Sequence, residues 1–208
     1  MGHRALVAYE RMDGTYNLHY THWGGCNLRL KHRVTEATPF SGDTPSQWAR
    51  EVHRALTTGS NPASVRDSYH IDGSCPTDVE PIPRETGVTL AKALSGQLDN
   101  LHHETFYVVD RAFDVTAYRT LWFGLQYDSE TVERQPTVGF GAVRTVRWYD
   151  GAPVGDGRAR GEFAGTNRDV SELPDGGVFD VEDATEFWYE QEQATTDADR
   201  EVLFGTID

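Results

Sequence analysis

The chain has 208 residues, and its 33 aspartate and glutamate residues outnumber 19 lysine and arginine residues, which gives a formal net charge of −14. Hydrophobic residues make up 38% of the sequence and aromatic residues 11%, a composition that supports a hydrophobic core and excludes a disordered acidic chain. No apolar run approaches the roughly 18 residues of a membrane span, and two cysteines are too few for a disulfide framework or a four-cysteine zinc site.

The basic residues are almost all arginines, because Lys31 and Lys92 are the only lysines. An excess of carboxylates with so little lysine is typical of proteins from archaea that accumulate salt. At molar salt the Debye length is about 3 Å, so the net charge then counts neither for nor against a nucleic-acid partner. An ordinary acidic protein that is poor in lysine is the alternative. The N-terminus has no apolar signal region, so we expect a cytoplasmic protein in a high-salt cell.

The first third of the chain predicts a β-hairpin and a helix. Residues 4–10 and 15–20 are β-prone and flank the turn signal Asp13-Gly14. Residues 28–34 alternate apolar and basic side chains, which favours a third strand, with a short helix as the alternative. A helix is predicted from Thr44 as N-cap, with Pro45 at its first position, to Gly59.

The remainder predicts two more helices among several strands. Residues 57–88 carry four prolines and little periodicity, which indicates a long irregular insertion. A leucine stripe predicts a helix from about Thr89 to His103, and Asp180 is the predicted N-cap of a helix through Gln193. Strands are predicted at 106–109, 113–118, 121–127 and 138–149, followed by a turn at Asp150-Gly151 and a glycine-rich strand through Phe163.

This order of elements indicates an α+β fold with a mostly antiparallel β-sheet and about three helices packed against it. We expect a single domain over residues 1–195, interrupted by the insertion at 57–88, and a polar C-terminal tail over 196–208.

Histidines and one glutamate form a candidate metal site: His19, His22, His102, His103 and Glu104. Imidazole and carboxylate ligands suit zinc, iron or manganese. The spacing argues against a ready-made chelate, because His19 and His22 point to opposite faces of a continuous strand and adjacent histidines diverge by about 100° on a helix. Surface or capping histidines are the alternative interpretation.

Other catalytic motifs are absent from the sequence. There is no G-x-S-x-G nucleophile elbow, and Cys26 and Cys75 are more typical of small buried residues than of nucleophiles. The glycines around Gly155-Asp156-Gly157 have the wrong spacing for a dinucleotide fingerprint.

A second candidate surface combines basic and aromatic side chains. Its residues are Arg29, Lys31, Arg33, Arg144, Arg147, Trp148 and Tyr149. Arginines beside aromatic rings on a sheet suit single-stranded nucleic acid or an acidic protein partner. A solvent-exposed face balanced by nearby carboxylates is the alternative.

Several segments resemble an uncharacterised family of proteins from haloarchaea and their viruses. These are residues 1–10, 15–20, 101–104, 117–125 and 143–157, so the resemblance covers residues 1–35 and about 85–165. It implies a haloarchaeal lineage and an intracellular or virion setting. It implies no catalytic residues, because the family has no assigned activity.

Taken together, these features lead us to expect a non-enzymatic interaction or structural protein that binds a protein partner or a second copy of itself, without a membrane. The competing hypotheses are a metal-dependent hydrolase, such as a nuclease, that uses the His/Glu set, and a single-stranded nucleic-acid binder that uses the basic set.

Overall fold

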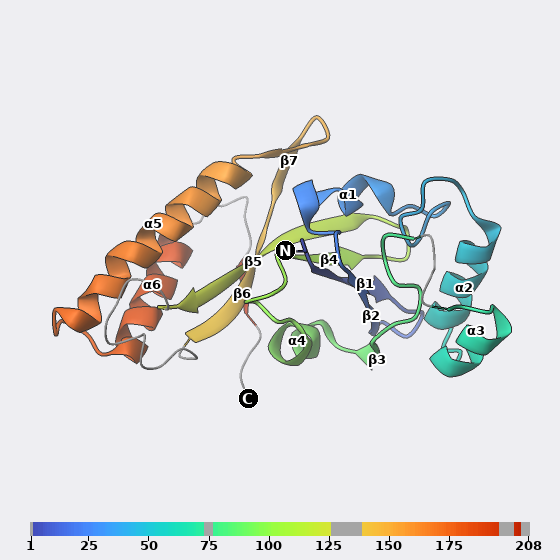
Figure 1. Cartoon of the computed structure of the whole chain (residues 1–208), viewed down its shortest axis with the longest axis horizontal. Coiled ribbons are helices and arrows are strands. Elements are labelled where there is room, and N and C mark those ends of the chain that lie inside the picture. Colours follow the sequence, from blue (N-terminus) through green and yellow to red (C-terminus); the bar gives the residue numbers. More distant parts are fainter. Residues whose placement is uncertain (1, 73–76, 126–138, 196–201, 205–208) are drawn as a thin grey trace. The chain divides into compact units, whose positions relative to one another are not determined.

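A computed structural model describes residues 2–72, 77–125, 139–195 and 202–204 (Figure 1). The chain separates into two compact units, one with residues up to Thr120 and the other with Leu121–Phe204. We call them unit 1 and unit 2 and describe each by itself. The prediction of one domain over residues 1–195 stays a prediction, and most of the predicted tail lies outside the described residues.

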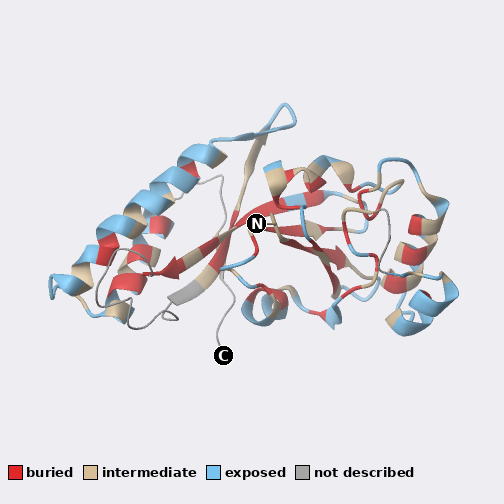
Figure 2. Ribbon diagram, in the orientation of Figure 1, coloured by how far each residue is buried: buried red, intermediate tan, exposed pale blue. Residues whose placement is uncertain are grey.

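Unit 1 is built on the predicted N-terminal hairpin, which the structure confirms. Strand β1 (Ala5–Glu10) pairs antiparallel with β2 (Tyr16–Thr21), with Ala5 opposite Thr21 and Glu10 opposite Tyr16. Gly14 has a φ of +79°, the left-handed conformation that such a tight turn requires. Residues 5–9 of β1 are all buried, which shows that both faces of this strand are covered (Figure 2).

Strand β4 (Thr105–Val109) lies on the other side of β1 and runs parallel to it. β3 (Glu85–Val88) pairs antiparallel with β2, and β5 (Val115–Gly124) pairs antiparallel with β4. With β6 (Gly139–Thr145) and β9 (Val202–Phe204), the strand order among the described residues is β3-β2-β1-β4-β5-β6-β9, a mixed and mostly antiparallel sheet of seven strands. This confirms the α+β class, but that part of the chain holds six α-helices, so the expectation of about three was too low.

Residues 28–34 form helical turns, and the predicted third strand is wrong. A 3-10 turn (Cys26–Leu28) is followed by α1 (Leu30–Arg33). The apolar residues Leu28, Leu30 and Val34 are all buried. The alternation of apolar and basic residues in this sequence therefore reflects which side chains are buried in a tightly turned segment, and not a strand.

Helix α2 (Gln47–Thr57) begins later than predicted. Its N-cap is Ser46, whose side chain accepts a hydrogen bond from the Ala49 N–H at 3.2 Å. Thr44 and Pro45 therefore precede the helix. Residues 57–88, predicted to be irregular, also contain α3 (Pro62–Ser68) and β3. Helix α3 forms there because Asn61 caps it and Pro62 occupies its first position.

The predicted helix from Thr89 is short. Thr89 caps α4 (Leu90–Lys92), a π-helical turn follows at Ala93–Gln97, and Leu98 is already extended. His102 and His103 therefore lie after the helical segment and before β4. Among the described residues, no helix combines the length and apolar character needed to cross a membrane.

Unit 2 contains residues 121–124 of β5, then β6 (Gly139–Thr145) and the hairpin β7 (Arg147–Tyr149) and β8 (Ala152–Val154), with its predicted turn at Asp150-Gly151. Strand β9 (Val202–Phe204) pairs with β6. The separate strands predicted at 113–118 and 121–127 are joined in one strand, β5, which ends at Gly124, and residues 126 and 127 of the second prediction lie outside the described residues.

Two helices complete unit 2. The predicted glycine-rich strand is confirmed only over β8 and is wrong from Asp156, where helix α5 (Asp156–Asp175) begins. Helix α6 (Val181–Thr195) confirms the predicted helix and its cap, because Asp180 accepts the Asp183 N–H at 2.9 Å. Their shared core is aromatic: the Trp188 ring lies 4.5 Å from Phe163 and 5.0 Å from Phe123.

Candidate functional site: a groove and a histidine cluster in unit 1

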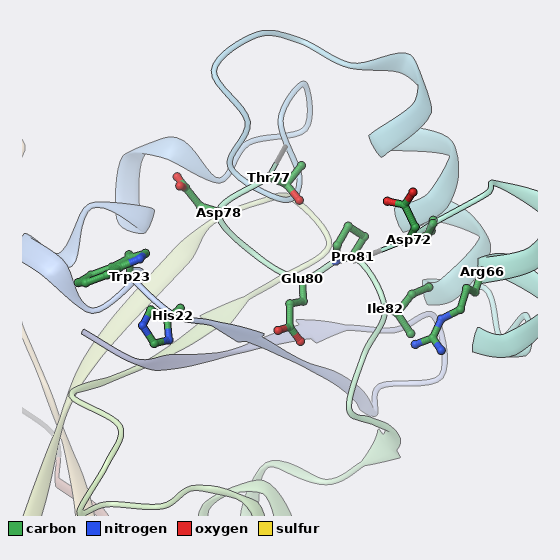
Figure 3. Close-up of a pocket in the computed structure, with 10 residues that line it drawn as sticks. His22, Trp23, Arg66, Asp72, Thr77, Asp78, Glu80, Pro81 and Ile82 are labelled. Atoms are coloured by element: carbon green, nitrogen blue, oxygen red, sulfur yellow. The ribbon is translucent and has the colours of Figure 1, made fainter. Parts of the chain in front are cut away.

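A cavity of about 670 Å³ opens beside the end of β2 (Figure 3). His22 and Trp23 follow β2 directly and form one wall, and the Trp23 side chain is 49% exposed. The facing wall comes from residues 77–82 and from the end of α3. The backbone holds these residues against β2, because the Glu80 N–H donates to the Tyr20 carbonyl at 2.8 Å and the Arg84 N–H donates to the Leu18 carbonyl at 2.7 Å.

A second cavity, of about 600 Å³, adjoins the first and shares Ile71, Asp72 and Thr77 with it. Its own walls include Trp48 of α2 and Tyr69 at the end of α3, which are joined by a 3.2 Å hydrogen bond from the Trp48 indole N–H to the Tyr69 carbonyl. We call the two cavities together the unit 1 groove. Trp23 lines the first cavity, and Trp48 and Tyr69 line the second.

The wall of the groove near Asp78 is held rigidly. The Asp78 carboxylate pairs with Arg29 at 2.8 Å and with Arg33 at 3.1 Å, and it accepts the Ser41 hydroxyl at 2.9 Å. Ser41 is buried with a φ of +58°, a backbone conformation that costs free energy in a residue with a Cβ and persists only where its surroundings enforce it. Asp78 is therefore a structural junction of this wall.

Imidazole and aromatic rings gather next to the groove. We call His3, Tyr20, His22, Trp23 and His103 the histidine–aromatic cluster. The His22 ring lies 4.9 Å from Trp23, and the Tyr20 hydroxyl is 3.1 Å from His22 Nδ1. His3 lies 6.1 Å from Trp23, and His103 lies 6.2 Å from Tyr20. The Arg84 guanidinium stacks over the Tyr20 ring at 3.6 Å.

One residue of the cluster, His3, forms a dyad with the neighbouring carboxylate of Glu104. His3 Nδ1 lies 3.0 Å from both oxygens of Glu104, and both side chains are partly exposed. A carboxylate at Nδ1 fixes the imidazole orientation and leaves Nε2 available to exchange a proton with a bound molecule. Neither His3 nor Trp23 was among the predicted site residues.

The structure brings together part of the predicted metal set. His22 and His103 both contact Tyr20, and Glu104 joins the same cluster through His3. His103 Nδ1 accepts the Asp99 N–H at 3.1 Å, and burial lowers the pKa of His103 below its usual range. Its other nitrogen, Nε2, therefore carries the proton.

His19 and His102 lie elsewhere. His19 is buried on the opposite face of the sheet, where its Nδ1–H donates to the Glu80 carbonyl at 2.8 Å, and burial lowers its pKa to about 3. His102 pairs with Asp99 at 2.7 Å on the surface. Within the described ranges, no group of three or more His, Cys, Asp or Glu side chains is placed to hold a metal ion.

The predicted basic surface is largely neutralised within the molecule. Arg29 and Arg33 pair with Asp78, Arg33 also pairs with Asp43, and the Lys31 ammonium donates to the Val115 carbonyl. In unit 2, Arg144 is buried in an ion pair with Glu192. Arg147, Trp148 and Tyr149 form β7, where Tyr149 is 78% exposed. The two halves of the predicted set belong to different units.

Comparison with known proteins identifies the family but no function. A family model described as a family of unknown function, DUF6735, matches residues 1–204. The chain belongs to this family. DUF6735 membership confirms the resemblance to an uncharacterised family and assigns no role to any residue. No match was found among curated proteins or among solved structures.

The two residues that sequence reasoning missed depend on strand pairing. The parallel register places Ala5 beside Thr105, and the Glu104 N–H donates to the Arg4 carbonyl at 2.9 Å. His3 and Glu104 therefore become neighbours only when β1 and β4 pair, which no local pattern reveals. The sequence signal for Trp23 was its position, since it precedes two glycines directly after a predicted strand.

Proposed function

We propose that the protein is a non-enzymatic interaction protein that binds an extended segment of a protein partner in the unit 1 groove. The observation that carries the proposal is Trp23, which is half exposed and belongs both to the histidine–aromatic cluster and to the wall of the groove. Large aromatic side chains left accessible beside a cavity are the residue type most enriched in binding hot spots. Trp48 and Tyr69 line the adjoining cavity, so an extended peptide lying across both cavities would contact aromatic side chains in each.

Selection from a displayed library of random peptides tests this proposal. Peptides enriched on the protein over an unrelated acidic protein are synthesised, and their affinities are measured by fluorescence anisotropy. We expect Trp23→Ala to weaken binding at least tenfold, because loss of a hot-spot aromatic typically costs 2 kcal/mol or more. Leu101→Ala is the matched control, since Leu101 in the same unit is 47% exposed and does not line the groove.

Two outcomes would refute the proposal. One is a library that yields no peptide with preference for this protein. The other is an equal loss of affinity in the Trp23 and Leu101 variants.

The His3–Glu104 dyad favours a second candidate, a hydrolase that shares only Glu104 and the neighbouring His22 and His103 with the set predicted for a metal-dependent hydrolase. His3 Nε2 would act as a general base on water or on a substrate hydroxyl held near His22 and Trp23. A panel of chromogenic carboxylic and phosphoric esters tests it, with and without added Zn²⁺ or Mn²⁺. We expect any activity to fall at least a hundredfold in His3→Gln and to persist in His32→Gln, which changes an exposed histidine of α1.

The predicted nucleic-acid function has no comparable observation in its favour. Arg29, Arg33 and Arg144 already have carboxylate partners, so binding phosphates would require breaking those pairs. We therefore do not propose it.

A further inference from the structure

A third cavity in unit 1, of about 180 Å³, is lined by an unusual share of the positive charge of the chain. Three of its lining residues are arginines, Arg50, Arg54 and Arg111, and a histidine, His53, lies between them. This concentration stands out in a protein whose net charge is −14. The cavity lies apart from the unit 1 groove, with which it shares no lining residue.

Helix α2 supplies most of the lining from one face. Arg50, His53, Arg54 and Thr57 stand at positions i, i+3, i+4 and i+7, which follow one stripe of an α-helix. Arginines four residues apart repel each other, so this stripe is not explained by helix stability alone.

The turn between β4 and β5 supplies the third arginine of the cavity lining, Arg111. Asp110 organises this turn, because its carboxylate accepts the N–H groups of Ala112 at 2.9 Å and Asp114 at 2.8 Å. Arg111 and Phe113 project from the turn into the lining of the cavity, and the Phe113 ring lies 5.0 Å from His53. Residues about 60 positions apart therefore converge on one site.

The positive charge of the cavity is only partly balanced. Arg111 pairs with Glu10 at 3.3 Å, and Glu36 is the other carboxylate in the lining. Within the described part of the chain, the guanidinium groups of Arg50 and Arg54 make no ion pair or side-chain hydrogen bond. Three guanidinium groups against two carboxylates leave a net charge of +1 in the lining with His53 neutral.

His53 adds a hydrogen-bonding group. Its ring packs against Tyr9 at 5.2 Å and against Phe113, and burial lowers its pKa to about 4. The imidazole is therefore neutral near pH 7, with one N–H donor and one acceptor nitrogen.

We propose that this cavity is an anion site that binds a phosphate group through Arg50 and Arg54. Guanidinium forks match the oxygens of phosphate and bind them through paired charge-assisted hydrogen bonds. The cavity is smaller than the roughly 300–1,000 Å³ of typical small-molecule pockets, so it accommodates the anionic group and not a large ligand. Free inorganic phosphate and the phosphate of a small monoester share this chemistry.

The experiment measures binding of inorganic phosphate and of phenyl phosphate by isothermal titration calorimetry at constant ionic strength in chloride. Arg50→Gln and Arg54→Gln each remove a guanidinium from an exposed position, so both variants are expected to fold. Arg160→Gln is the matched control, because Arg160 is an exposed helical arginine of α5 in unit 2. The thermal unfolding midpoint in chloride alone verifies the fold of each variant.

We expect saturable binding of at least one of the two anions, weakened about tenfold or more in each α2 variant and unchanged in Arg160→Gln. Stronger binding of inorganic phosphate would identify the free ion as the ligand, and stronger binding of phenyl phosphate would identify a monoester. Absence of saturable binding by the unmodified protein overturns the proposal. So does binding that the control variant weakens as much as the α2 variants do.

Discussion

At the scale of single residues, burial divides the histidines of unit 1 into two chemical groups. His19 and His53 lie in an aromatic environment with Tyr9 and Phe40, and burial lowers the pKa of His19 to about 3 and that of His53 to about 4. His3 and His22 are accessible at the cluster beside the groove. The first pair is therefore neutral near pH 7, with His53 also lining the third cavity, whereas the second pair is accessible beside the unit 1 groove.

The buried pair predicts loss of stability in mild acid. In the unfolded chain both imidazoles have pKa values near 6.5, so below that pH the unfolded state takes up protons that the folded state does not bind. The free energy of unfolding therefore falls as the pH decreases from about 6.5 to about 4.5, by roughly 1.4 kcal/mol per pH unit for each histidine. Urea denaturation at several pH values in this range measures the slope.

Two variants isolate the contribution of one histidine. His53→Leu removes one of the two proton-linked groups, so the slope is expected to decrease by about half. His32→Leu changes an exposed histidine and should leave the slope as it is. Equal slopes in the two variants would show that His53 does not remain neutral in the folded protein.

Residue types alone did not reveal which charged side chains are available to bind a ligand. Arg29 and Arg33 were correctly identified as a basic group, but their partners Asp43 and Asp78 lie 10 to 49 positions away in the chain. The arginines of the third cavity were missed for the same reason. Arg111 lines the same cavity as Arg50 and Arg54 only in the folded protein. Ion pairs between distant segments are set by tertiary structure, which no local pattern of a single sequence reveals.

At the scale of elements, predictions held where a local signal was strong. Asp13-Gly14 specifies the first hairpin, and Asp180 specifies the start of α6. Helix α5 was mistaken for a strand because its glycines, such as Gly157 and Gly161, lower helix propensity. Packing against Trp188 of α6 stabilises it in spite of that propensity, as tertiary contacts commonly do for helices.

The corrected start of α2 gives a sharp stability prediction. Ser46→Ala removes the N-cap acceptor of the Ala49 N–H, so the free energy of unfolding is expected to fall by about 1 kcal/mol. Thr44→Ala, at the cap position predicted from the sequence, is expected to change it by less than about 0.5 kcal/mol. Chemical denaturation of the two variants side by side measures both values. A larger loss in the Thr44 variant would place the helix start where the sequence pattern put it.

At the scale of the whole molecule, the net charge of −14 predicts stabilisation by salt. Excess like charge destabilises a compact state through repulsion, and raising salt from 0.1 M to 1 M shortens the Debye length from about 10 Å to about 3 Å. We expect the thermal unfolding midpoint to rise by several degrees over this range in KCl and equally in NaCl. A midpoint that stays constant or falls would mean that carboxylate repulsion is unimportant to this fold.

The parallel pairing of β1 with β4 also has a kinetic consequence. The β1–β2 hairpin joins neighbouring segments, whereas Ala5 must pair with Thr105 about a hundred positions away, and the entropic cost of that closure is larger than that of the hairpin. His22 and Trp23 are adjacent in the chain, so their rings can pack together early. His103 and Glu104 join them only after the long loop between β1 and β4 closes. During synthesis, β1 keeps one edge unpaired until β4, about a hundred residues later, has been made. The complete cluster thus exists only in a molecule whose first and middle strands have met.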